Sequence, residues 1–312
     1  MPTNTLDGTL TAIRSITRDY FLKDIVDSVY TSNSLLMKLK GNMESIDGGD
    51  FIRVPVQYAR FSARNWYQGD ESLPINNNDK IFNLIFQWKQ ANISISISGL
   101  NRLKNSGSAK VIDHLKSEVD IAKRDMADLF GTGLYSAGTD PKSISGARTY
   151  LSTSNTYGGV SQSTESWLQA KGDTTSTTLS LSLMQARYEA ASEPPIRPNF
   201  CTTTETLFNA YMNLLTPVQR FSDSKMADAG FQNVLYRGMP VVEDSYVPSS
   251  YLIMHNLDYF NIYAHSQRPF PGEFIDWELP TNQDVMTSHF LFMGEAICKA
   301  PRYQGFFSAL TG

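Results

Sequence analysis

Residues 51–98 constrain the fold most, because they predict two strands joined by a long polar tip. In each half, apolar residues alternate with polar ones, the period-two pattern of a half-buried strand. These apolar residues are Ile52, Val54, Val56 and Tyr58, then Phe82, Leu84, Phe86 and Trp88. The pattern shifts to Ile93, Ile95 and Ile97, so a bulge or bend is expected within residues 89–92. At about 3.3 Å per residue such an arm reaches roughly 40 Å, and a neighbouring copy could cover it.

A single amphipathic helix is predicted after this hairpin, at residues 108–130. Its apolar residues recur at steps of three and four, with charged residues between them. They are Val111, Leu115, Val119, Ala122, Met126, Leu129 and Phe130. At about 1.5 Å per residue, the helix would be roughly 35 Å long. Gly131 and Gly133 are predicted to stop it.

The other segments predict an α+β fold in which helices cover a mixed sheet. Residues 1–40 have helical spacing, and residues 138–178 are rich in Ser, Thr and Gly, which predicts a variable surface region. A strand at 199–202 leads into a helix, for which Thr202 and Glu205 have capping-box spacing. Further predicted elements are a helix at 179–192, strands at 234–236, 239–242, 251–255 and 260–264, and a strand pair at 273–279 and 289–299.

Composition excludes several functional classes. The net charge is −4, with acidic and basic residues interspersed, so no basic surface for duplex nucleic acid is visible. No run of eighteen apolar residues or secretory signal occurs, and a soluble, intracellular chain is expected. Cys201 and Cys298 are predicted to be buried thiols, because two distant cysteines are too few for a disulfide framework or a zinc site.

No catalytic, metal-binding or cofactor-binding motif is found. The four histidines are scattered without metal-ligand spacing, and no phosphate-binding loop or nucleophile elbow is present. The adjacent carboxylates Asp70 and Glu71 are typical of a solvated loop rather than an acid/base pair. The chain is therefore predicted not to be an enzyme and to need no cofactor.

Five large aromatic residues on the hairpin are the candidate site. A projecting two-stranded arm leaves such side chains in solvent unless another chain covers them, which favours a subunit interface over an intrachain core. They are Trp66, Tyr67, Phe82, Phe86 and Trp88. Lys80, Lys89 and the three asparagines at 76–78 are interpreted as the charged and polar residues of a soluble arm.

The order of these elements resembles the major capsid protein of tailed bacteriophages, with its Hong Kong 97-type fold. The most specific segments are FQNVLYRGMPVVEDSYVP at 231–248 and LIMHNLDYFNIYAH at 252–265. RPNFCTTTETLFNAYMNLL at 197–215 is similar to the strand and helix that precede them in that family. The likeness covers nearly the whole chain as architecture, and none of it is a catalytic signature.

The resemblance implies five parts. They are an N-terminal arm at 1–46, an extended hairpin loop at 47–98, a peripheral domain at 99–158 with a spine helix at 108–130, an axial α/β domain at 159–265, and peripheral return strands at 266–312. It also implies a structural function, namely self-assembly into an icosahedral shell around packaged double-stranded DNA. The lysine, asparagine and glutamate that crosslink the founding member cannot be matched here, so that chemistry is not carried over.

The implied partners are other copies of the chain, as pentamers and hexamers, together with a portal protein, a possible decoration protein and non-specific contact with packaged DNA. A separate scaffolding protein is expected, because only about forty residues precede the hairpin. The expected location is the virion, assembled in the host bacterial cytoplasm without a membrane. Two alternatives stay open: an encapsulin-like nanocompartment shell, and an enzyme with an unfamiliar site.

Overall fold

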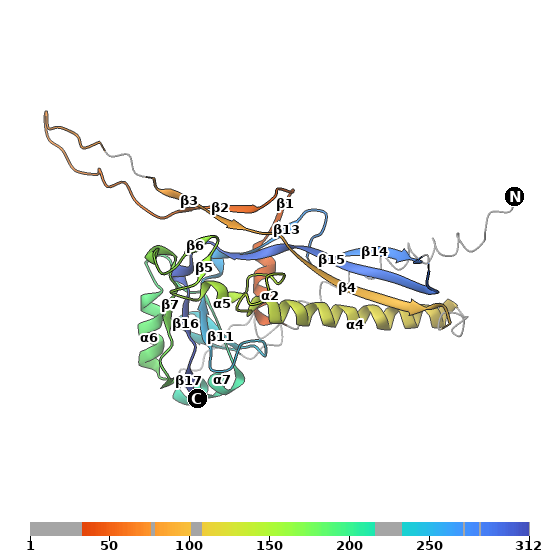
Figure 1. Ribbon diagram of the computed structural model, residues 1–312. Helices are drawn as coiled ribbons and strands as arrows, with labels where there is room; N and C mark the ends of the chain where they lie inside the picture. Colours follow the sequence, from red (N-terminus) through yellow and green to blue (C-terminus); the bar gives the residue numbers. More distant parts are fainter. Residues whose placement is uncertain are drawn as a thin grey trace.

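The computed structural model describes residues 33–75, 79–100, 108–215, 233–270, 272–280 and 282–311. Within these residues, the strands form a five-stranded sheet, a six-stranded sheet and three two-stranded sheets, one of which is a projecting arm. The arm projects from one side of the body, while a long helix, α4, extends the opposite way beneath the five-stranded sheet (Figure 1). The predicted α+β class is confirmed.

The five-stranded sheet is organised around one long strand. β15 (Val285–Cys298) pairs antiparallel with β4 (Lys89–Ser98), with β14 (Glu273–Glu278) and, at its far end, with β13 (Phe260–His265). A parallel strand, β1 (Met43–Ile46), completes the sheet beside β13. The predicted strand pair at the end of the chain is confirmed, although β15 begins four residues before the predicted residue 289.

Helix α4 (Ser108–Leu134) packs on the apolar face of this sheet. Phe130 lies edge-on to Phe292 at 4.9 Å between ring centroids, and the buried residues Ile95 and Ile97 of β4 belong to the same core. The predicted helix is confirmed, but the predicted stop at Gly131 and Gly133 is wrong, since both lie inside the helix.

Close packing explains the two helical glycines. A Cβ on Gly131 would lie 2.6 Å from the ring of Tyr246, and one on Gly133 would lie 2.9 Å from the side chain of Ile144. Glycine therefore permits close approach here, and the helix continues because its next turn remains buried at Leu134.

The six-stranded sheet forms a second layer with its own helices. Its order is β10 (Asn233–Tyr236), β11 (Met239–Glu243), β9 (Phe200–Thr203), β12 (Leu252–His255), β16 (Gly305–Phe307) and β7 (Lys171–Asp173). Helices α6 (Leu181–Ala190) and α7 (Glu205–Leu214) pack near it around the buried residues Met184, Phe208 and Tyr211. The predicted strands and helices of this region are confirmed. Thr202 lies within β9, however, and the N-cap of α7 is Thr204 rather than the predicted Thr202.

The sheets do not follow the expected division at residue 265. β13 lies before that boundary yet belongs to the five-stranded sheet, and β16 lies after it yet belongs to the six-stranded sheet. The chain therefore crosses between the two layers more often than the linear order of segments suggests.

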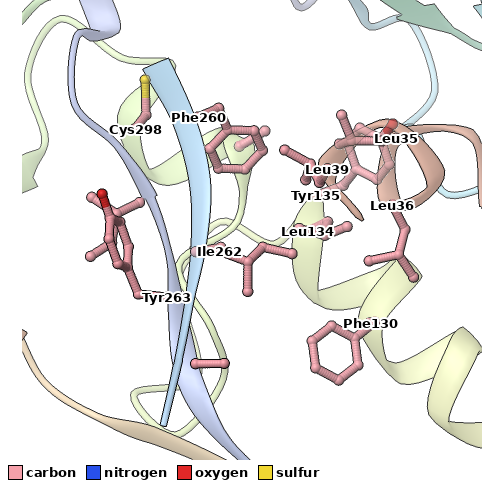
Figure 2. Close-up of a cluster of buried hydrophobic side chains, with 14 of the residues drawn as sticks. Leu35, Leu36, Leu39, Phe130, Leu134, Tyr135, Phe260, Ile262, Tyr263 and Cys298 are labelled. Carbon is pink, nitrogen blue, oxygen red and sulfur yellow. The ribbon is translucent and has the colours of Figure 1, made fainter. Parts of the chain in front are cut away.

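Part of the expected N-terminal arm is core. Helix α2 (Ser34–Leu39) places Leu35, Leu36 and Leu39 between α4 and β13, facing Phe130 and Ile262 (Figure 2). An arm that reached a neighbour would leave these leucines in solvent, and here their exposed fraction is zero. The first 32 residues of the predicted helical segment lie outside the described residues.

Residues 138–178 are also more buried than predicted. They contain the short elements α5 (Ala147–Tyr150), β5 (Thr156–Tyr157), β6 (Val160–Ser161) and β8 (Thr177–Thr178), the last of which pairs with β17 (Leu310–Thr311). The side chains of Tyr150, Gln162 and Leu168 are fully buried. The prediction of a variable surface region is therefore wrong for these residues. The low apolar content of this segment gives no indication of these few deeply buried side chains.

Candidate subunit interface

The projecting arm is a two-stranded antiparallel sheet. β2 (Ile52–Gln57) pairs with β3 (Ile81–Phe86), from Ile52 opposite Phe86 at the base to Gln57 opposite Ile81 at the outer end. Beyond these strands, the chain runs without regular secondary structure through residues 58–75, and the asparagines at 76–78 lie outside the described residues. Figure 1 shows this connection extending away from the body.

The base of the arm belongs to the core of its own chain. Phe86 lies edge-on to Tyr157 at 5.1 Å between centroids, and the backbone N–H of Ile85 donates to the carbonyl of Gly158 at 3.0 Å. Leu84 packs closely on Gly158, because a Cβ added to Gly158 would lie only 2.8 Å from the Cβ of Leu84. Phe86 is only 6% exposed, which corrects its expected role as an exposed contact residue.

Trp88 occupies the joint between the arm and the body. Its indole Nε1 donates to the carbonyl of Gly49 at 2.7 Å, and its ring lies 5.7 Å from that of His265. β3 ends at Phe86 and β4 begins at Lys89, so the chain leaves one sheet and enters another at residues 87–88. The change of apolar face therefore occurs where the chain passes between the two sheets, at residues 87–88. This is slightly before the bulge predicted at residues 89–92. The indole of Trp88 thus already has a hydrogen-bond acceptor and a ring contact within its own chain.

The outer part of the arm carries the other three predicted contact residues. Trp66 is fully exposed, Tyr67 is exposed, and Phe82 retains 43% exposure at the outer end of β3. Sequence reasoning missed other exposed apolar residues on the same arm. They include Phe61, Leu73, Ile75, Ile81 and Ile85. The signal was present in IFNLIF of β3, where apolar residues occupy both faces of the strand.

Proline affects how this arm can make contacts. Pro55 lies in the middle of β2, opposite Asn83. Proline has no backbone N–H, so the outer edge of β2 cannot present an unbroken row of donors to an added strand. Contacts of this edge of β2 with another chain would therefore rely on side chains.

The titratable side chains of the body are mainly structural. His255 is buried between Phe200 and Phe260, its Nε2 lies 3.1 Å from the hydroxyl of Thr202, and burial lowers its pKa to about 3. The predicted burial of Cys201 and Cys298 is confirmed, and both are free thiols.

The other candidate groups from the sequence do not form a site. Asp70 and Glu71 are exposed on the arm, and the side chain of His114 lies outside the described residues. The described residues contain no group of three or more side chains able to hold a metal ion.

One buried carboxylate stands apart from these groups. Glu295, on β15, accepts hydrogen bonds from the backbone N–H groups of Ser145 at 2.6 Å and Ala296 at 2.9 Å. Burial raises its pKa to about 7, although these two hydrogen bonds and the charge of Lys89 favour the ionised form.

In the described part of the chain, no helix is both long and apolar enough to span a membrane.

Comparison with known proteins identifies the fold. No family model and no curated protein matches the sequence. Among solved structures, the chain is similar to the cyanophage A-1(L) capsid asymmetric unit, with 13% identity, a TM-score of 0.61 and coverage of 90% of this chain and 94% of the other. The capsid of the native GTA particle gives 11% identity, a TM-score of 0.62 and coverages of 90% and 91%.

A third solved structure has a different source. The virus-like particle from Pyrococcus furiosus gives 12% identity, a TM-score of 0.51 and coverage of 91% of this chain and 95% of that one. At these identities, the likeness establishes the fold. The chain therefore has the mixed helix and sheet fold of phage capsid proteins.

Proposed function

We propose that this protein is the major capsid protein of a tailed phage, with a Hong Kong 97-type fold, and that it assembles into an icosahedral shell around packaged double-stranded DNA. The observation that carries the proposal is the outer arm, which holds fully exposed Trp66 on a chain with a phage capsid fold. A monomer in water gains nothing from an apolar projection of this kind, whereas a shell buries it between copies.

The elements have corresponding roles under this proposal. The arm of β2 and β3 is the extended loop that lies over a neighbouring subunit, and α4 is the spine helix of the peripheral domain. The six-stranded sheet with α6 and α7 is the axial domain, which meets its copies around five-fold and six-fold axes. Trp66, Tyr67 and Phe82 are the proposed contacts, and many weak contacts of one kind add up to a closed shell.

The proposed partners follow from that role. They are other copies in pentamers and hexamers, a scaffolding protein, a portal protein and a decoration protein. Packaged DNA would be touched without sequence specificity. Assembly would take place in the host bacterial cytoplasm, and the protein would then remain in the virion.

Electron microscopy of the expressed protein tests the proposal. Negative-stain images and light scattering of the chain, alone and with the neighbouring scaffold gene, should show closed shells or capsomer rings. Trp66→Ser should lower the yield of assembled particles at least tenfold while leaving the circular dichroism spectrum unchanged. Trp66→Phe is the matched control and should retain most of the yield. A monodisperse monomer in both preparations would contradict the proposal.

An encapsulin-like nanocompartment is the second candidate. It is favoured by the similarity to the virus-like particle from Pyrococcus furiosus. Composition of the purified particles separates the two functions. A shell that encloses a cargo protein and excludes nucleic acid supports the nanocompartment, and a shell that fills with double-stranded DNA in the presence of the packaging machinery supports the phage capsid.

A further inference from the structure

A surface cavity lies between the long helix and the start of β4. Its volume is about 460 Å³, which is within the range of binding pockets, and the loop at residues 139–144 closes one side. The apolar lining includes Ala91, Leu129, Phe130 and Ile144. Leu129 is 46% exposed, so part of this apolar wall has no cover within its own chain.

The charges around the cavity are mainly positive. Lys89 and Lys142 line it, together with the single carboxylate of Asp140. The ammonium of Lys89 donates to the carbonyl of Pro141, which fixes that charge at the cavity wall. Asp140 accepts from the backbone N–H of Lys142 at 2.9 Å and so belongs to the turn itself.

The tip of the arm has the opposite character. Residues 65–75 contain two acidic residues, Asp70 and Glu71, and no lysine or arginine. Trp66 and Ile75 in the same segment are almost completely exposed. The tip therefore combines apolar side chains with a charge of −2, and the cavity combines an apolar lining with an excess of basic side chains. The two surfaces are complementary in both respects.

We propose that the cavity receives the arm tip of a second copy of this chain, with Trp66 inserted among the apolar side chains and Asp70 and Glu71 beside Lys142. The inference rests on the proposed shell function and specifies its contact. Trp66 is fully exposed in the single chain, so the tip does not fill the cavity of its own copy. Because projection and cavity occupy different places on one chain, the contact is heterologous, and such contacts form rings when the rotation between copies closes.

Crosslinking between two variants, each with one added cysteine, tests the contact. Gln68→Cys places a thiol beside Trp66 on the tip, and Thr132→Cys places one at the cavity, since both positions are exposed and Thr132 lines the cavity. The native thiols of Cys201 and Cys298 are buried and should not compete. The two variants are mixed, assembled and treated with a short bismaleimide, and the linked peptides are identified by mass.

Arg124→Cys is the matched control on the same helix. Arg124 is exposed, does not line the cavity, and lies eight residues before Thr132, about 12 Å along the helix axis. The expected yield of the 68–132 crosslink is at least tenfold above that of 68–124. Trp66→Ser in the Gln68→Cys chain should lower the 68–132 yield at least tenfold.

The outcomes separate this inference from the proposed function. Shells that form normally but give equal yields at positions 124 and 132, or no 68–132 crosslink, would overturn the contact and leave the shell function standing. Insensitivity of the yield to Trp66→Ser would likewise overturn the role of Trp66. If the unsubstituted chain forms neither shells nor rings, the proposed function fails and the inference fails with it.

Discussion

Glu295 shows how strongly one buried side chain can couple this fold to pH. Its pKa is raised from 4.5 to about 7 because the carboxyl lies in the core, where two backbone N–H groups compensate only part of the lost hydration. Between these two pH values the folded chain holds a proton that the unfolded chain has released. This group's contribution to stability therefore increases as pH falls from 7 to 4.5, and above pH 7 the fold must bury a charge.

Glu295→Gln should remove that dependence. Glutamine keeps an oxygen that can accept from Ser145 and Ala296, but it carries no charge. The variant should be more stable than the unsubstituted chain at pH 8, by up to about 3 kcal/mol, and should lose this advantage at pH 4.5. Urea unfolding at the two pH values measures the difference. Exposed Glu278→Gln is the control, and parallel pH profiles for all three proteins would contradict the prediction.

Within the helix α4, Gly131 is a position where glycine should be more stabilising than alanine, which is the reverse of the usual preference in a helix interior. Alanine normally stabilises a helix interior by about 1 kcal/mol relative to glycine. Here the added Cβ would lie 2.6 Å from the ring of Tyr246, and overpacking of this kind costs about 1–3 kcal/mol. The overpacking cost less the helix-forming gain means that Gly131→Ala should lower the free energy of unfolding by up to about 2 kcal/mol.

Thermal unfolding of matched variants checks this balance. Gly41→Ala is the control, because a Cβ at Gly41 meets nothing within 4 Å. Gly131→Ala combined with Tyr246→Ala should recover the helix-forming benefit of alanine relative to Tyr246→Ala alone. A stabilised Gly131→Ala single variant would show that the close approach of Tyr246 does not constrain the helix.

Individual elements could be predicted where periodicity is strong. The apolar steps of α4 and the alternation in β4 reflect burial against one neighbouring layer, so these two elements could be recognised from their local pattern. The glycines in α4 misled the prediction because their role depends on Tyr246 and Ile144, which are distant in sequence. Likewise, the burial of Phe86 depends on Tyr157, which no local pattern indicates.

At the scale of the whole molecule, Asp244 joins three separate parts. It is buried after β11 and accepts from the hydroxyl of Ser34 in α2 at 2.7 Å and from that of Tyr135, directly after α4, at 3.2 Å. The backbone N–H of Tyr246 donates to it at 3.1 Å. One carboxylate therefore connects the N-terminal helix, the long helix and the six-stranded sheet.

Asp244→Ala should destabilise the chain by about 2–4 kcal/mol, because the hydroxyls of Ser34 and Tyr135 lose their acceptor inside the core. Asp244→Asn keeps one acceptor oxygen and should cost less. Urea unfolding measures the global loss, and hydrogen exchange of the α2 amides measures whether that helix opens first. Unchanged exchange in α2 together with an unchanged unfolding midpoint would contradict this role.

The order of elements along the chain could be predicted at this scale, and it carried the resemblance to capsid proteins. Sheet membership could not, because strands as short as β16 and β7 have too few residues for a periodic pattern. Of the five predicted contact residues, Trp66, Tyr67 and Phe82 are exposed, and their contact with another copy stays a prediction, whereas Phe86 and Trp88 are held by Tyr157 and Gly49. The cavity beside α4 combines distant segments and has no local signature.

The position of β16 has a consequence for biosynthesis. This strand lies inside the six-stranded sheet, between β12 and β7, although its residues follow those of β7 by more than a hundred positions (Figure 1). The sheet cannot close until residue 307 has left the ribosome, and a pairing so distant in sequence forms late. A nascent chain would thus present its arm of β2 and β3 before the body that supports that arm is complete.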